Sequence, residues 1–189
     1  MVLIAKTKYL EFKSVRCPDG NGEWSYVHRT NEASGHDSAV VITTLVKTNG
    51  EYNFLFLKTK RPPIYEENKA EFCIESPAGL IADIDKHETL IQCLQKELLE
   101  ETGLKADKIF IDIMNSCTSA GLSSETITYA TAIIDNYKII QTPVNDNGVI
   151  VDRFLIPVSA INDYFKNINN SISLAAPTVC GAHFALLHI

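Results

Sequence analysis

Apolar, β-branched and aromatic residues concentrate in four short runs near the start of the chain, with polar turn residues between them. These β-prone runs cover residues 6–15, 24–29, 38–46 and 52–57. The first two flank the turn-forming stretch 18–22, and the last two are joined by Asn49-Gly50, a dipeptide that favours the positive φ of a tight hairpin. The pattern therefore predicts two successive hairpins, the first in an N-terminal extension and the second at the start of a larger domain.

A helical period first appears in the middle of the chain. Leu90, Ile91, Leu94 and Leu98, with Cys93 as a further candidate, fall on one stripe within residues 88–101, which are rich in helix formers, and Gly103 supplies a C-terminal stop. Further strands are predicted at 72–76, 109–114, 126–134 and 150–156, and further helices near Ser159 and Pro177. Strands around a central helix, with helices later, predict an α/β sandwich with a mixed sheet.

Composition and charge narrow the classes of function. The chain has 189 residues, with 17 basic and 23 acidic side chains, so charge gives no reason to expect a nucleic-acid partner. The five cysteines are widely spaced, which favours reduced, mostly buried thiols over a disulfide framework or a zinc site. The apolar opening 1–5 is broken by Lys6 and Lys8, so we expect no signal peptide, no membrane segment and a cytoplasmic protein.

The helix predicted at 88–101 carries several carboxylates on one face. Glu97 lies three and four residues before Glu100 and Glu101, spacings that bring side chains together on a helix. Such a cluster repels itself unless a cation lies between its members, and Mg²⁺ or Mn²⁺ prefers oxygen ligands of this kind. The alternative is an ordinary solvated helix face, which is the usual fate of an acidic run.

The spacing of these glutamates resembles the Nudix box, G-x5-E-x7-R-E-U-x-E-E-x-G-U, where U is a bulky aliphatic residue. The matching positions are Glu88, Glu97, Leu98, Glu100, Glu101, Gly103 and Leu104. Lys96 stands in place of the box arginine, and counting back from Glu88 places Ala82 where the box glycine belongs, with Gly79 three residues too early. A short insertion at 82–86 accounts for this difference.

The resemblance implies a Nudix α/β/α sandwich and a metal-dependent hydrolase. It implies that Glu97, Glu100 and Glu101 are catalytic metal ligands, that the backbone carbonyl of Ala78 assists them, and that Glu88 supports the loop. The cofactor implied is Mg²⁺, with Mn²⁺ as a possible substitute. Metal ions of this kind neutralise phosphate charge and activate water, which suits hydrolysis of a pyrophosphate.

Segments outside the box resemble the ADP-ribose and ADP-sugar pyrophosphatases of the same superfamily. Residues 75–81 resemble their E-x-P-A-G-L-I segment, 61–63 their R-P-P, 24–30 their W-E-x-V-x-R-T and 118–125 their S-P-G-x-S-x-E loop. The substrate-binding residues implied are Trp24, Arg29, Asp37, Arg61, Gly121 and Glu125. Trp24 would stack on adenine, although a tryptophan is more often a core or dimer-interface residue, and Arg61 has the alternative of a surface arginine.

One family residue has no counterpart. The subgroup supplies a catalytic glutamate in a loop before a late strand, and alignment places Gly148 or Val149 there. Asp146, Asp152 or Glu125 could replace it, and we favour Asp146 because its Asn/Asp/Gly loop could carry a carboxylate over the phosphates. Composition alone would make Asp146 a turn former.

The sequence thus predicts a homodimeric ADP-ribose or ADP-sugar pyrophosphatase that acts on a small nucleotide-sugar. Residues 1–35 are the dimer-forming extension and 36–189 the hydrolase domain. Two alternatives stay open. One is a pyrophosphatase for UDP-sugars or another nucleoside diphosphate derivative. The other, motivated by Gly148, Val149 and Lys96, is a nucleotide-binding regulatory protein with weak turnover.

Overall fold

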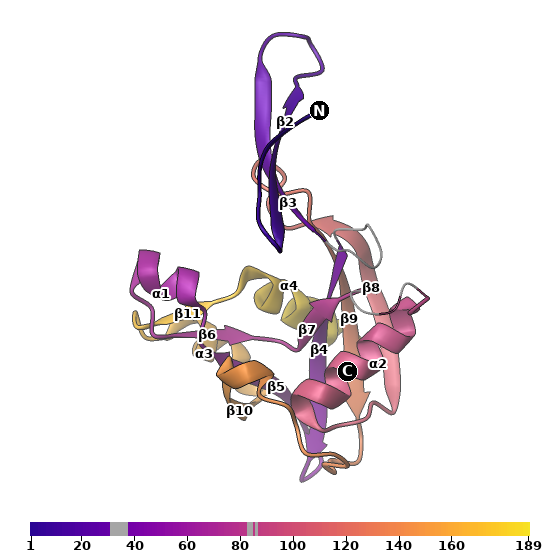
Figure 1. The fold of residues 1–189 in the computed structure, drawn as a ribbon. Helices are drawn as coiled ribbons and strands as arrows, with labels where there is room; N and C mark the ends of the chain where they lie inside the picture. The colour runs from indigo at the N-terminus through magenta and orange to yellow at the C-terminus, as the bar shows by residue number, and fades with distance from the viewer. Residues whose placement is uncertain (31–37, 83–84, 86) are drawn as a thin grey trace.

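A small antiparallel sheet precedes a larger mixed sheet that has helices on both faces (Figure 1). The computed structural model describes residues 1–30, 38–82, 85 and 87–189. The small sheet consists of β1 (Val2–Lys6), β2 (Leu10–Arg16) and β3 (Glu23–Arg29), with β2 in the centre. The first predicted hairpin is confirmed, and the opening run, for which we predicted no element, forms β1.

Eight strands form the large sheet. They are β4 (Ser38–Thr48), β5 (Glu51–Thr59), β6 (Phe72–Glu75), β7 (Ala78–Leu80), β8 (Lys108–Cys117), β9 (Thr126–Ile134), β10 (Ile150–Pro157) and β11 (Ile172–Leu174). The order is β11-β6-β5-β4-β9-β8, while β10 pairs with β5 and β7 pairs with β4. The β4–β9 and β6–β11 pairs are parallel and the others antiparallel, so the predicted mixed sheet is confirmed.

Four α-helices accompany this sheet: α1 (Pro62–Asn68), α2 (Leu90–Thr102), α3 (Ile161–Lys166) and α4 (Ala176–Ala185). Short 3-10 turns lie at Asp146–Gly148, Val158–Ala160 and Leu186–His188. The predicted α2 is confirmed: Thr89 and Gln92 form a capping box at its start, and Gly103 ends it with φ 72°. No described helix has the length and apolar character needed to cross a membrane.

Alternate residues of β4 face helices on opposite sides of the sheet. Val40 and Ile42 pack with Leu94 and Leu98 of α2, whereas Val41 packs in a cluster that includes Phe184 of α4. A strand has a side-chain period of two, so one fully buried strand supplies both layers of the core. This arrangement confirms the α/β/α sandwich.

Gly181 lets α4 approach β4 closely. A Cβ at this position would lie 2.2 Å from the buried Oγ1 of Thr43, whose branched side chain has little freedom to move. We therefore expect Gly181→Ala to lower the free energy of unfolding by about 1–3 kcal/mol through overpacking. Urea unfolding measures this, and an unchanged midpoint would contradict the close packing.

Several sequence expectations differ from the structure. Helix α1 was not predicted, because it buries none of its residues and therefore shows no apolar stripe. Strands β7 and β11 have three residues each, too few to give a period. The expectation of mostly buried thiols is wrong: Cys73 and Cys93 are buried, but Cys17 is partly exposed and Cys117 and Cys180 are exposed.

Candidate active site

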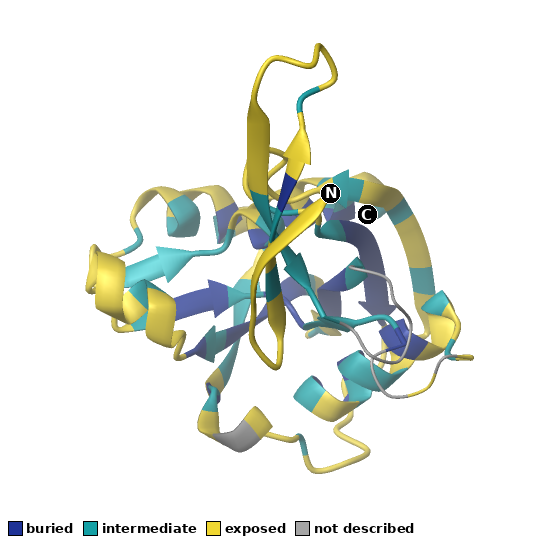
Figure 2. Ribbon diagram, turned by 45° about the horizontal axis from the view of Figure 1, so that its top comes forward, coloured by how far each residue is buried: buried dark blue, intermediate teal, exposed yellow. Residues whose placement is uncertain are grey.

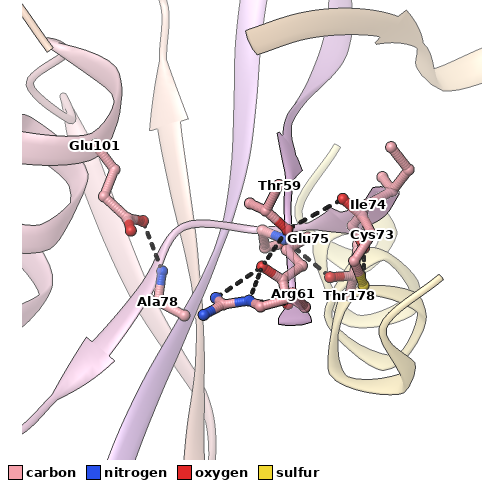
Figure 3. Close-up of polar contacts among 9 residues, drawn as sticks. Thr59, Arg61, Cys73, Ile74, Glu75, Ala78, Glu101 and Thr178 are labelled. Atoms are coloured by element: carbon pink, nitrogen blue, oxygen red, sulfur yellow. Dashed lines mark hydrogen bonds and ion pairs between the residues drawn. The ribbon is translucent and has the colours of Figure 1, made fainter. Parts of the chain in front are cut away.

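The pairing of β7 with β4 brings the segment after Pro77 against helix α2. The backbone N–H of Ala78 donates a hydrogen bond to Glu101 Oε2 at 2.9 Å (Figure 3). Glu97 lies one turn earlier, against Gly79, where a Cβ would come within 2.1 Å of its carboxyl carbon. The structure thus places two of the predicted catalytic glutamates beside the predicted loop.

Electrostatics set Glu101 apart from an ordinary carboxylate. The pKa of Glu101 is raised to about 8, mainly by burial and also by the charges of Glu97 and Glu75, while the Ala78 N–H and Arg61 oppose the shift. Loss of solvation is the largest cause of this shift, and the two nearby carboxylates, Glu97 and Glu75, add to it. A bound cation is the natural counter-charge for such a group.

Lys96 connects two glutamates of the box. Its Nζ lies 2.9 Å from Glu88 Oε1 and 3.3 Å from Glu97 Oε1, and the other carboxylate oxygen of Glu88 accepts the Ala82 N–H at 3.0 Å. Although burial raises it, these hydrogen bonds lower the pKa of Glu88 below its usual range. The lysine therefore holds the loop and Glu97 together as a point charge, without the planar fork of arginine.

Ala82 occupies the register of the box glycine and has a glycine-like backbone, with φ 54°. The left-handed region costs an alanine roughly 1 kcal/mol that glycine does not lose. We expect Ala82→Gly to stabilise the protein by up to about 1 kcal/mol, less the extra entropy of a glycine in the unfolded chain. Thermal unfolding tests this, and a lower melting temperature would show that the loop does not impose the strain.

The predicted oxygen ligands suit a hard divalent cation, but their side chains are not already arranged around a single point. Glu100 is exposed on the last turn of α2, next to Glu101. Among the described residues, no group of three or more His, Cys, Asp or Glu side chains is arranged to hold a metal ion. The fit therefore rests on chemistry: oxygen donors on one helix face, around a half-buried carboxyl that lies near two other carboxylates.

A cleft of about 370 Å³ lies beside β7. Its lining includes Arg29, Arg61, Glu75, Ala78, Gly79 and Glu125. Glu75 holds Arg61 through contacts of 3.0 Å to Nε and 2.8 Å to Nη2, and Thr59 Oγ1 donates to the same carboxylate at 2.9 Å (Figure 3). Four predicted site residues, two of them arginines, thus share a cleft with Gly79.

The N-terminal sheet reaches this cleft through β3. Arg29 donates from Nε and Nη2 to Glu125 Oε2 at 2.9 and 2.8 Å, and Trp24 Nε1 donates to the carbonyl of Gly121 at 2.9 Å. Trp24 is 53% exposed, so it is not a core residue of this chain. The predicted residues 24, 29, 121 and 125 come together, whereas Asp37 lies outside the described residues.

Asp146 lies on the loop before β10. It is exposed, has a left-handed φ of 42° and begins a 3-10 turn. The neighbouring Asn145 is bound by Arg153, which also donates to the carbonyl of Glu101. The loop therefore contacts the end of α2, and Arg153, which no motif contains, is a residue that the sequence reasoning missed.

Glu75 was part of a quoted motif but was not predicted to bind substrate or metal. The structure shows that it orients Arg61, and the only sequence signal was its place two residues before Pro77. Thr59, the other partner of Glu75, gave no signal, because a buried threonine at a strand end is common.

Comparison with known proteins decides the family. No protein-family model matches the chain. An uncharacterized Nudix hydrolase of Schizosaccharomyces pombe is 31% identical over 166 residues, which are 82% of this chain and 75% of the relative. The chain belongs to the Nudix hydrolase family. A putative Nudix hydrolase of Caenorhabditis elegans is 28% identical over 166 residues, 84% of this chain and 69% of that protein.

Solved structures share the fold of this Nudix hydrolase. The crystal structure of an ADP compounds hydrolase superposes with a TM-score of 0.68 and 15% identity, covering 99% of this chain and 90% of that one. The Nudix domain of Shewanella oneidensis NrtR, complexed with ADP ribose, has a TM-score of 0.55 and 16% identity, covering 80% and 86%. The Nudix resemblance and the fold expected from the sequence are confirmed.

Proposed function

We propose that this Nudix hydrolase cleaves the pyrophosphate of ADP-ribose or a related ADP-sugar, releasing AMP and a sugar phosphate. The observation that carries the proposal is the cleft in which Arg29 and Arg61 lie beside the Ala78–Gly79 backbone, the same segment that contacts Glu97 and Glu101. Two guanidinium groups suit a diphosphate, because each has planar N–H donors in pairs. The neighbours that hydrolyse ADP compounds or bind ADP ribose support this choice.

Different residues of the chain have different roles in the proposed reaction. Glu75 fixes Arg61 so that the guanidinium donors not directed at Glu75 are available to phosphate oxygens. Glu97, Glu100 and Glu101, with the backbone carbonyl of Ala78, would hold Mg²⁺ or Mn²⁺. When bound, this ion neutralises phosphate charge and activates water. Asp146 accepts the proton of the attacking water.

The adenosine half of the substrate lies on the N-terminal side. Trp24 presents an exposed ring that stacks on adenine, and its indole N–H is already satisfied by Gly121. The Arg29–Glu125 pair holds β3 against the loop, so both residues are fixed where the nucleoside enters. Asp37 belongs to this side by resemblance alone.

The selectivity of Trp24 tests the choice of nucleotide. We expect Trp24→Leu to reduce the ratio of kcat/KM for ADP-ribose over UDP-glucose by about 10-fold, since adenine offers a larger ring face than uracil. Tyr65→Leu is the matched control, an exposed aromatic residue that does not line this cleft. An unchanged ratio in Trp24→Leu, or a wild type that prefers UDP-glucose, would reject the assignment.

Residues 1–35 also form the dimer interface in this proposal. The small sheet leaves Leu3, Leu10, Phe12 and Val15 exposed, and it stands away from the large sheet (Figure 2). Apolar area of this kind favours association with a second copy. Analytical ultracentrifugation should show a dimer that Phe12→Glu dissociates, and a monomeric wild type would refute it.

A further inference from the structure

The C-terminal carbonyls of α2 are satisfied by a segment far along the chain. The carbonyl of Glu100 accepts the N–H of Val144 at 2.7 Å, and that of Gly103 accepts the N–H of Ile140 at 2.9 Å. The last carbonyls of a helix have no partner inside it, so such bonds fix what they touch. The segment around 140–149 is therefore hydrogen-bonded to the end of the helix that carries Glu100 and Glu101 (Figure 1).

Arg153, from β10, also binds the end of α2 and this segment. Its Nε donates to the carbonyl of Glu101, its Nη1 to Asn145 Oδ1 at 2.9 Å and its Nη2 to the carbonyl of Val144 at 2.5 Å. One guanidinium thus binds both the end of α2 and the loop residues directly before Asp146. Only arginine offers donors in several directions from one rigid plane.

We propose that Arg153 is a positioning residue for the pyrophosphatase reaction. It locks the loop of Asp146 to the last turn of α2, so that the loop carboxylate and the helix carboxylates keep one geometry. Arg153 does not touch the reacting atoms. The expected kinetic effect rests on the proposed function, whereas the contact between Arg153 and the loop is present without substrate.

Two measurements on the full-length protein test the proposal. Arg153→Gln should lower kcat for AMP release by about 10- to 100-fold with KM changed by less than about threefold, the size of loss typical of residues that orient metal ligands. Asp146→Asn should add little in the Arg153→Gln background, because both changes remove the same placed carboxylate. Hydrogen exchange at the Val144 amide should become faster.

Two further variants serve as comparisons for Arg153→Gln. Asn145→Ala removes one of the three contacts and should give a smaller loss, while Lys166→Gln, an exposed basic residue at the end of α3, should match wild type. Additive effects of Arg153→Gln and Asp146→Asn would overturn the positioning role, as would unchanged exchange at Val144. If wild type releases no AMP, the proposed function fails, and hydrogen exchange still decides whether Arg153 holds the loop.

Discussion

Glu101→Gln is expected to lower metal-dependent AMP release by at least about 100-fold, because it removes the charge of a proposed metal ligand without changing its volume. The glutamine oxygen can still accept the N–H of Ala78, so the β7 contact persists. The fold should not weaken. The pKa of Glu101 is raised from 4.5 to about 8, so its ionisation costs stability progressively as pH rises through that window. Above pH 8 the variant should be at least as stable as wild type.

The measurement is AMP release at saturating Mg²⁺, together with thermal unfolding at pH 6 and pH 8.5. Glu51→Gln is the matched control, an exposed glutamate at the start of β5, and should leave both unchanged. A Glu101→Gln enzyme with full activity would remove this residue from the metal site. A large drop in the melting temperature of Glu101→Gln at pH 8.5 would contradict the expectation that the ionised Glu101 carboxylate destabilises the fold.

Gly79→Ala is expected to lower kcat by about 100-fold with little effect on stability. The new Cβ would lie 2.1 Å from the carboxyl carbon and 2.3 Å from Oε1 of Glu97, and the flexible end of that side chain is the part free to move. The clash is therefore relieved by displacing the Glu97 side chain, a proposed metal ligand, rather than by distorting the core. Displacements of about 1 Å in a catalytic group cost roughly this much in rate.

A double variant isolates this cause. In a Glu97→Ala background the clash is absent, so adding Gly79→Ala should have almost no further effect on kcat. Equal losses in both backgrounds would show that the alanine acts through the cleft or the β7 backbone instead. Urea unfolding of Gly79→Ala alone, with a midpoint close to wild type, checks that the change is local.

Sequence patterns predicted those parts of the fold and site that local spacing determines. The spacing of Leu90, Ile91, Leu94 and Leu98 located α2, although Ile91 is exposed and not part of the buried stripe. The register of Glu88, Glu97 and Glu101 located the box. Ala82 stands in the register of the box glycine, and its positive φ is a backbone conformation that glycine adopts easily. Local rules were sufficient because helix periodicity and turn chemistry act over a few residues.

The remaining site features depend on contacts between distant residues. Arg29 meets Glu125 across 96 positions, and only family resemblance, not spacing, pointed to both. Arg153 binds the end of α2 from 52 positions away, and its strand pattern gives no sign of that role. Such side-chain contacts follow from how strands and helices pack, which a single sequence does not encode in any local pattern.

The most direct test of the proposed activity is AMP release from ADP-ribose by the purified full-length chain, with Mg²⁺ and with EDTA, beside a nucleoside triphosphate. We predict rapid release with Mg²⁺, loss of release in EDTA and little turnover of the triphosphate. ADP-ribose that binds in calorimetry but is not hydrolysed with Mg²⁺ or Mn²⁺ would contradict the account, and would make the cleft a nucleotide-binding site on a Nudix scaffold.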